Sequence, residues 1–202
     1  MILREISNKP IRCSVLLSLI LIALIAGCKS KESYRREIER KGMTYSVESF
    51  LNSAAGGHKE TIVLFLKGGM DINARGDRGE TALMLAAVNH NIELLKFLID
   101  NGAHVNDRDN NGYTALMFVS SEGDREAAGF LIGKGADMDS QNNNGETALM
   151  LAVLHDNLEL TKILVDKGAD IHVQDNRRRE VIDYAFLNNQ IKELLRKAMT
   201  RK

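Results

Sequence analysis

The sequence has no tryptophan, a single proline and only two cysteines in 202 residues. Aromatic residues make up 5% of the chain, which leaves little for the stacking platforms that bind single-stranded nucleic acid. Lysine and arginine number 27, as do aspartate and glutamate, so the basic excess of phosphate-binding proteins is missing. We therefore expect no nucleic-acid partner. The 44% of hydrophobic residues excludes a wholly disordered chain.

The first 27 residues differ in composition from the rest of the chain. Arg4, Lys9 and Arg12 give a basic start, and residues 15–27 are apolar apart from Ser18. A helix of this length spans roughly 20 Å, which is less than the roughly 30 Å hydrocarbon core of a bilayer. The order of a basic start, a short apolar run and small residues predicts a secretory signal peptide.

The end of this run resembles the lipobox of bacterial lipoproteins. Residues 25–27 read Ile-Ala-Gly and stand directly before Cys28. The resemblance implies cleavage after Gly27 and acylation of Cys28, which would hold the mature protein on a membrane. Lys29, next to the acylated position, favours the periplasmic side of the outer membrane in a Gram-negative cell. An ordinary cleaved signal with a chance cysteine and an uncleaved anchor are the two alternatives.

Both cysteines, Cys13 and Cys28, lie in this segment. The chain after Cys28 therefore has no thiol, which excludes a disulfide, a zinc thiolate site and a cysteine nucleophile there. Residues 28–43 are dense in charges of both signs and nearly free of large apolar side chains. We expect them to form a solvated, charged tether, with a transient helix as the alternative.

The rest of the chain repeats with a period of 33 residues. Three threonines share this spacing, and each opens the sequence Thr-Ala-Leu-Met: Thr81, Thr114 and Thr147. Two sets of glycines keep the same step: Gly79, Gly112 and Gly145, and Gly69, Gly102, Gly135 and Gly168.

This pattern resembles the ankyrin repeat, whose unit holds two helices and ends in a Gly-Ala turn. The resemblance implies an all-α solenoid of helix-turn-helix units joined by β-hairpin fingers. We divide the ankyrin-repeat domain, residues 44–202, into five units, of which the first and last are capping repeats: 44–76, 77–109, 110–142, 143–175 and 176–202.

Each recurring residue has a physical role in this scheme. The three threonines cap the first helix of their units, because a hydroxyl group accepts from a free amide in the first turn. Gly102, Gly135 and Gly168 end the second helix in a left-handed conformation. Gly112 and Gly145 are expected at the finger tips, where a positive φ is needed.

The units depart from the ankyrin pattern at two positions. Alanine replaces the usual proline, and methionine replaces the usual histidine at Met84, Met117 and Met150. We expect these methionines to pack in the core. The alternative is that they scavenge oxidant, which would make the protein a periplasmic oxidative-stress protection factor.

The third unit is expected to be the least stable. It places Ser120 and Ser121 where its neighbours have more apolar residues, and it puts Gly129 inside a helix. We expect the amides of residues 125–133 to exchange faster than those of residues 92–99.

No motif in the repeats carries chemistry. The five histidines fall in different units without the spacing of metal ligands, and the serines lack the context of a nucleophile. We expect a non-catalytic monomer with no metal and no cofactor. The basic residues near the C-terminus, Lys192, Arg196, Lys197, Arg201 and Lys202, are read as a solvated helix face, with a lipid-headgroup contact as the alternative.

Surface recognition is the function that remains. Ankyrin arrays bind proteins through their fingers and the concave face of their first helices, which implies a protein partner, with a scaffold and a toxin-immunity protein among the possible roles. The expected finger contacts are Arg75, Asp77, Arg78, Arg108, Asn110, Asn111, Tyr113, Asn143, Asn144, Glu146, Arg177 and Arg179. Those at the ends of the first helices are Val88, Asn89, Ser121, Glu122, Leu154 and His155. Tyr113 is expected to be the most exposed aromatic side chain.

Overall fold

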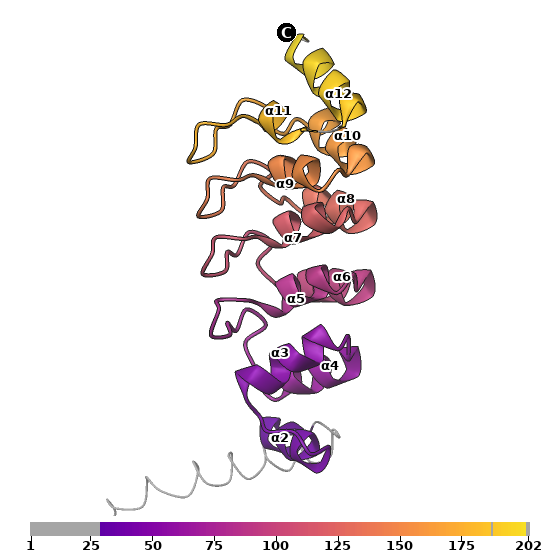
Figure 1. The fold of residues 1–202 in the computed structure, drawn as a ribbon. Helices are drawn as coiled ribbons and strands as arrows, with labels where there is room; N and C mark the ends of the chain where they lie inside the picture. The colour runs from indigo at the N-terminus through magenta and orange to yellow at the C-terminus, as the bar shows by residue number, and fades with distance from the viewer. Residues whose placement is uncertain (1–28, 187, 201–202) are drawn as a thin grey trace, which may run out of the picture.

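The computed structural model describes residues 29–186 and 188–200, which form a stack of helical pairs (Figure 1). Within these ranges there are eleven helices and no β-strand. The helices are α2 (Lys31–Arg40), α3 (Val47–Ala55), α4 (Lys59–Lys67), α5 (Ala82–Val88), α6 (Ile92–Asp100), α7 (Ala115–Glu122), α8 (Arg125–Gly133), α9 (Ala148–Leu154), α10 (Leu158–Asp166), α11 (Val181–Tyr184) and α12 (Asn189–Thr200).

The helices form two rows. The inner row holds α3, α5, α7, α9 and α11, and the outer row holds α4, α6, α8, α10 and α12; the loops before α5, α7, α9 and α11 project from the inner row as fingers (Figure 1). Each inner helix packs on the next one and on its own outer partner. One continuous apolar core therefore runs through the stack from Ile38 to Leu195, and the predicted solenoid is confirmed.

The threonine caps are confirmed. The hydroxyl groups of Thr81, Thr114 and Thr147 accept hydrogen bonds from the amides of Met84, Met117 and Met150, at 3.3–3.4 Å. The following Ala-Leu-Met residues are buried in every one of these helices. The Thr-Ala-Leu-Met sequence thus begins each helix and fixes the face that it buries.

The fingers differ from the predicted β-hairpins. Each finger closes with one backbone hydrogen bond across its base, such as the bond from Asp109 N–H to Tyr113 O at 3.0 Å. Successive fingers are also joined at their tips, where, for example, the Asn110 backbone amide donates to Arg78 O of the preceding finger at 2.9 Å. Because the backbone groups at the tips pair between units, no strand ladder forms within one finger.

The finger-tip glycines are required by this close approach. A Cβ atom on Gly145 would lie 2.6 Å from the backbone nitrogen of Asn176 in the next finger. Gly79 and Gly112 face the next finger in the same way. In the finger before α11, which is the last that the structure describes, Arg178 takes the same positive φ, at 61°.

Residues 31–40 do not form the expected tether. They form α2, which packs on α4 and buries Ile38 completely. The Arg35 Nε donates to Gly68 O at 3.0 Å, and its guanidinium group lies over the Tyr45 ring, 4.6 Å from the centroid. The sequence pattern did not reveal the helix, because its one buried residue, Ile38, stands among charged residues. Helix α2 packs on the first unit and thus enlarges the N-terminal capping repeat.

The predicted signal peptide and Cys28 lie outside the described residues. Within the described ranges, no helix is both long enough and apolar enough to cross a bilayer.

Candidate functional site

The predicted contact residues lie on the outside of the fingers and at the ends of the inner helices. Most are exposed: Arg75, Asp77, Arg78, Val88, Asn89, Arg108, Asn110, Asn111, Glu122, Asn143, Asn144, Leu154, His155 and Arg177. The others are half-buried: Tyr113, Ser121, Glu146 and Arg179. The side chains of several residues in both groups are engaged within the array.

One set of finger residues holds neighbouring units together. Asn143 Nδ2 donates to Asn110 O at 2.9 Å, and Asn110 Nδ2 donates to Asp77 O at 3.0 Å. Asn176 repeats the contact one unit later, reaching Asn143 O at 2.9 Å. These asparagines form a ladder along the finger tips, so their side-chain amides are engaged within the array.

A second ladder runs along the finger bases. Arg75 donates to Arg108 O at 2.6 Å, and Arg108 donates to Gln141 O at 2.6 Å. Gln141 continues the series to Gln174 O at 2.9 Å. The guanidinium groups of Arg75 and Arg108 thus bridge successive fingers, although both residues are exposed, and their contact with a partner stays a prediction.

Tyr113 is not the most exposed aromatic side chain. Its ring stacks on Phe118 with a centroid separation of 5.4 Å, and burial followed by the negative charge of Glu146 raises the pKa of its hydroxyl group. Phe186, which follows α11, is 63% exposed. Phe186 could not be selected from the repeat pattern, because its exposure follows from an inner helix of unit five that ends after only four residues.

The ends of the inner helices expose a row of apolar side chains. Val88 closes α5 and is 40% exposed, and Leu154 closes α9 and is 45% exposed. Phe186 extends the row beyond α11. At the position between Val88 and Leu154 in the 33-residue register, α7 has the polar Ser121, so Val88 stands apart from the other two. Leu154 and Phe186 line the same pocket, and we call these two residues the inner-row patch.

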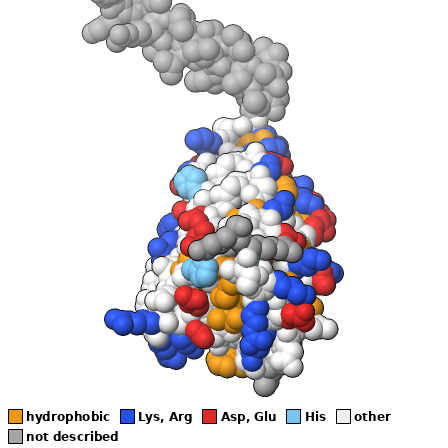
Figure 2. Space-filling model, turned by 90° about the horizontal axis from the view of Figure 1, so that it is seen from above, with side chains coloured by type: hydrophobic (Ala, Val, Ile, Leu, Met, Phe, Trp, Pro, Cys, Tyr) orange, Lys and Arg blue, Asp and Glu red, His pale blue; other side chains and the backbone are white. Residues whose placement is uncertain are grey.

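A shallow pocket of about 180 Å³ lies within the inner-row patch. Its lining comes from the ends of α9 and α11 and the turns that follow them: Val153, Leu154, Asp156, Tyr184, Ala185, Phe186 and Asn188. The view onto the C-terminal end shows apolar side chains gathered in a strip between charged side chains of both signs (Figure 2). The pocket lining itself combines the apolar side chains of Val153, Leu154 and Phe186 with the polar side chains of Asp156 and Asn188, which resembles the apolar centre and polar rim of a protein interface.

Finger four, the loop before α11, has two exposed arginines next to a third arginine that is paired within the fold. Arg177 and Arg178 are exposed and form no ion pair within residues 29–186 and 188–200. Arg179 is different: it pairs with the buried carboxylate of Asp175 at 2.7 Å, and its guanidinium group lies 4.5 Å from the centroid of the Tyr184 ring. Of the predicted arginines in this finger, Arg177 is thus available to a partner, and Arg179 is part of the fold.

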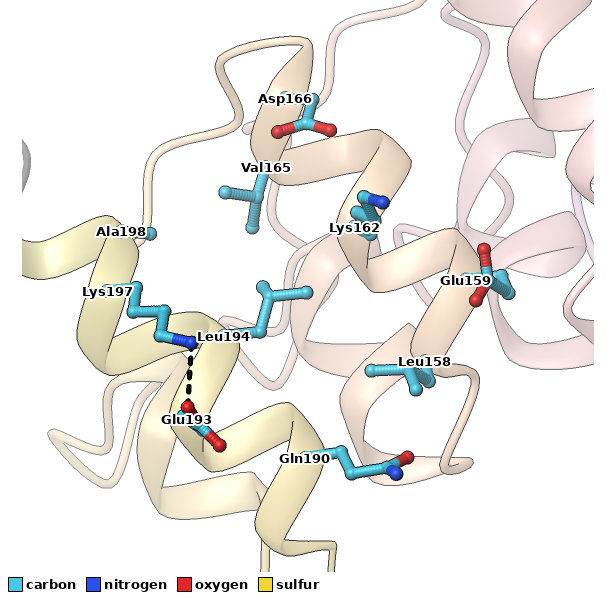
Figure 3. Close-up of a pocket in the computed structure, with 10 residues that line it drawn as sticks. All are labelled: Leu158, Glu159, Lys162, Val165, Asp166, Gln190, Glu193, Leu194, Lys197 and Ala198. Atoms are coloured by element: carbon cyan, nitrogen blue, oxygen red, sulfur yellow. Dashed lines mark ion pairs between the residues drawn. The ribbon is translucent and has the colours of Figure 1, made fainter.

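A larger groove, of about 370 Å³, separates α10 from α12 in the outer row (Figure 3). Leu158, Val165, Leu194 and Ala198 supply its apolar lining, and charged residues stand around them, including Glu193 and Lys197, which pair at 2.7 Å. Figure 3 shows these side chains rising from two facing helices without converging on one point. The groove is open and offers no arrangement of a nucleophile with a base.

The core methionines occupy the interior. Met84, Met117 and Met150 are each 1% exposed. Their burial confirms that they pack the core, and it removes the accessible sulfur atoms on which an oxidant-scavenging role depends. Across the residues that the structure covers, no three His, Cys, Asp or Glu side chains are grouped so that they could hold a metal ion.

Comparison with known families agrees with this architecture. The family model described as ankyrin repeats in three copies matches residues 50–142 and 116–200. No curated protein matches the chain. Ankyrin repeats are generally protein-binding modules and are typically not catalytic. The two matches together cover most of the chain, from the first inner helix to the end of α12. The chain belongs to the ankyrin-repeat family.

Proposed function

We propose that this protein is a lipid-anchored, non-catalytic module of the bacterial cell envelope that binds another protein. The observation that supports this best is the inner-row patch. Large apolar side chains grouped on the surface of an otherwise polar fold are typical of interaction sites. Leu154 and Phe186 border the pocket of about 180 Å³ and supply the apolar centre of the interface.

The fingers supply the polar part of the proposed interface. Asp77, Arg78, Asn111 and Arg177 are exposed, and their side chains make no contact that holds one finger to the next. Arginine is a frequent anchor of protein interfaces. Roles as a scaffold and as an immunity protein both require such a surface, and they differ only in the partner.

The anchor is proposed from the sequence. The basic start, the apolar run and the lipobox-like residues before Cys28 support acylation of this cysteine and placement on the periplasmic side of the outer membrane. Labelled palmitate is expected to enter the parent chain and to be absent from Cys28→Ala. Equal labelling of the two chains would contradict the anchor.

Capture from envelope extracts tests the binding function. The full chain is used as bait, and bound proteins are identified by mass spectrometry. Leu154→Asp and Phe186→Ser are expected to lose the captured protein, whereas Lys162→Asp on the outer row keeps it. A separate pair, Arg78→Ala and Tyr113→Ala, tests the fingers. If the parent retains a protein and neither the inner-row variants nor the finger variants reduce its capture, the proposed interface is wrong.

A further inference from the structure

Only Lys29 and Ser30 separate Cys28 from α2, the first helix that the structure describes. The side chain of Ser30 caps α2 by accepting from the Ser33 amide at 3.2 Å, and the helix begins at Lys31. Three Cα steps join Cys28 to Lys31, and these span at most roughly 11 Å. An acyl group on Cys28 would therefore hold the start of α2 near the bilayer surface.

Helix α2 is fixed to the array. Ile38 is fully buried, and Arg35 bonds to the carbonyl group of Gly68 after α4. A membrane anchor at Cys28 would thus position the whole stack through a docked helix.

The charge of the chain differs between α2 and the repeats. Residues 29–41 contain six basic and three acidic side chains, whereas residues 42–188 contain 13 basic and 22 acidic side chains. Arg36, Arg40 and Lys41 are exposed, and Arg36 and Arg40 lie one turn apart on α2. An anionic surface attracts this end and repels the repeats that follow it.

We propose that α2 lies against the bilayer surface, where its basic side chains contact anionic phospholipid headgroups. This inference rests on the proposed anchoring at Cys28 and adds an orientation to it. Figure 1 places α2 at one end of the stack and α12 at the other. Neighbouring helices pack about 8–10 Å apart, and four such steps lead along the outer row from α4 to α12. The last unit therefore lies roughly 40 Å from the end of the stack that holds α2. The inner-row pocket near α11 then lies well clear of the headgroups.

The basic side chains of α12 are the competing contact. Arg196 and Lys197 are exposed at the opposite end of the stack. The two ends cannot both lie on one flat surface while the array stands upright. The proposed acyl group on Cys28 is close to α2 along the chain, and it therefore favours α2 over α12 as the helix that contacts the bilayer.

Amide exchange on vesicles tests the contact. The full chain, purified from the membranes of the cells that produce it, is reconstituted into phosphatidylcholine vesicles with and without phosphatidylglycerol, and exchange is measured by mass spectrometry. Exchange in residues 31–41 is expected to slow roughly tenfold or more on the anionic vesicles, given several basic groups at the surface. The Arg36→Gln, Arg40→Gln, Lys41→Gln variant should lose this protection.

Two further variants locate the contact. Arg125→Gln, Lys162→Gln, Lys167→Gln removes the same number of charges from the outer row and should keep the protection. Arg196→Gln, Lys197→Gln should keep it as well. Equal exchange of residues 31–41 on neutral and anionic vesicles would overturn the proposal, as would protection that moves to residues 189–200.

The mass of the N-terminal peptide, measured in the same samples, separates the two proposals. Protection of α2 without acylation supports the surface contact and contradicts the anchor chemistry. Acylation without lipid-dependent protection contradicts the surface contact and leaves the anchor intact.

Discussion

The Tyr184 hydroxyl group donates to Oδ2 of Asp175 at 2.8 Å, and the Arg179 guanidinium group pairs with the same oxygen at 2.7 Å. This network joins finger four to α11, where the usual threonine is replaced by Glu180. Burial by itself raises the pKa of Asp175. The hydrogen bonds from Arg179, Tyr184 and the Arg177 amide outweigh burial and lower that pKa to about 2.

The network makes stability depend on pH in the acid range. Because the pKa of Asp175 is lower in the folded state, its contribution is present above about pH 4 and is lost as the pH falls toward 2. We expect Tyr184→Phe to reduce the free energy of unfolding by about 1 kcal/mol at pH 7, after allowance for the partly exposed Arg179. Urea titrations between pH 2 and pH 7 measure the effect.

The loss caused by Tyr184→Phe should shrink toward pH 2, as Asp175 becomes protonated in the folded parent. Tyr34→Phe at the other end of the stack is the control, and it should have the same small effect throughout. A loss that is independent of pH would contradict the assignment to Asp175.

Ser120 is a buried polar group without a partner. Its Oγ has no hydrogen bond to any part of the chain that the structure describes, and the residue is fully buried in α7. The equivalent positions hold Ala87 and Val153, both buried. We expect Ser120→Ala to raise the free energy of unfolding by about 1 kcal/mol, because an unpaired hydroxyl group leaves the core. Thermal and urea unfolding measure the change.

Ser53 provides the matched control for this prediction. It is also buried, but its hydroxyl group donates to Ser49 O at 2.7 Å, so Ser53→Ala should not stabilise the chain. A lower stability of Ser120→Ala would show that the hydroxyl group of Ser120 has a partner in solution.

Gly129 lies inside α8, and a Cβ atom added there would meet nothing within 4 Å. Gly129→Ala should therefore stabilise the protein by about 1 kcal/mol. Gly135 is the control in the same unit: its surroundings are also open, but its φ of 86° disfavours alanine. Stabilisation by both substitutions would mean that backbone conformation does not decide the outcome.

The same features predict where the array opens first. Amides of residues 125–133 are expected to exchange faster than those of residues 92–99, and Gly129→Ala combined with Ser120→Ala should narrow the difference. Hydrogen exchange at neutral pH measures both. Equal protection of the two segments in the parent would contradict a weak third unit.

Much of the fold could be predicted because its signals are local. A threonine that caps its own helix, and a glycine that ends one, act within a few residues and recur every 33 positions. The docking of α2 could not be predicted in this way, since Arg35 and Gly68 are far apart in sequence. Its one buried side chain, Ile38, is surrounded in the sequence by charged residues, so no apolar periodicity marks the helix.

The candidate site was predicted only in part, for a related reason. Leu154 was selected because it ends an inner helix, and it is exposed as expected. Asn110 and Asn143 have the same polar character as free surface residues, but they pair with the neighbouring finger. Phe186 is exposed because α11 is short, and no periodic signal marks that ending.

Arg178 combines a positive φ with an exposed side chain. It has a φ of 61° at a tip position that is glycine in the three preceding fingers. Arg178→Gly should raise the free energy of unfolding by about 0.5–1 kcal/mol and weaken binding of the captured protein, if finger four contacts it. Unfolding and affinity measurements on one preparation check both effects. Arg108→Gly is the contrast, because it breaks the ladder to Gln141 and should lower stability.

Site-specific photo-crosslinking tests the central claim most directly. A photoreactive amino acid is placed at Leu154 on the inner row, or at Lys162 on the outer row, in the full chain within cells that produce it. The account predicts a crosslinked protein partner from position 154 and none from position 162. Crosslinking from position 162 alone, or from neither position while capture still retains the partner, would contradict recognition through the inner row.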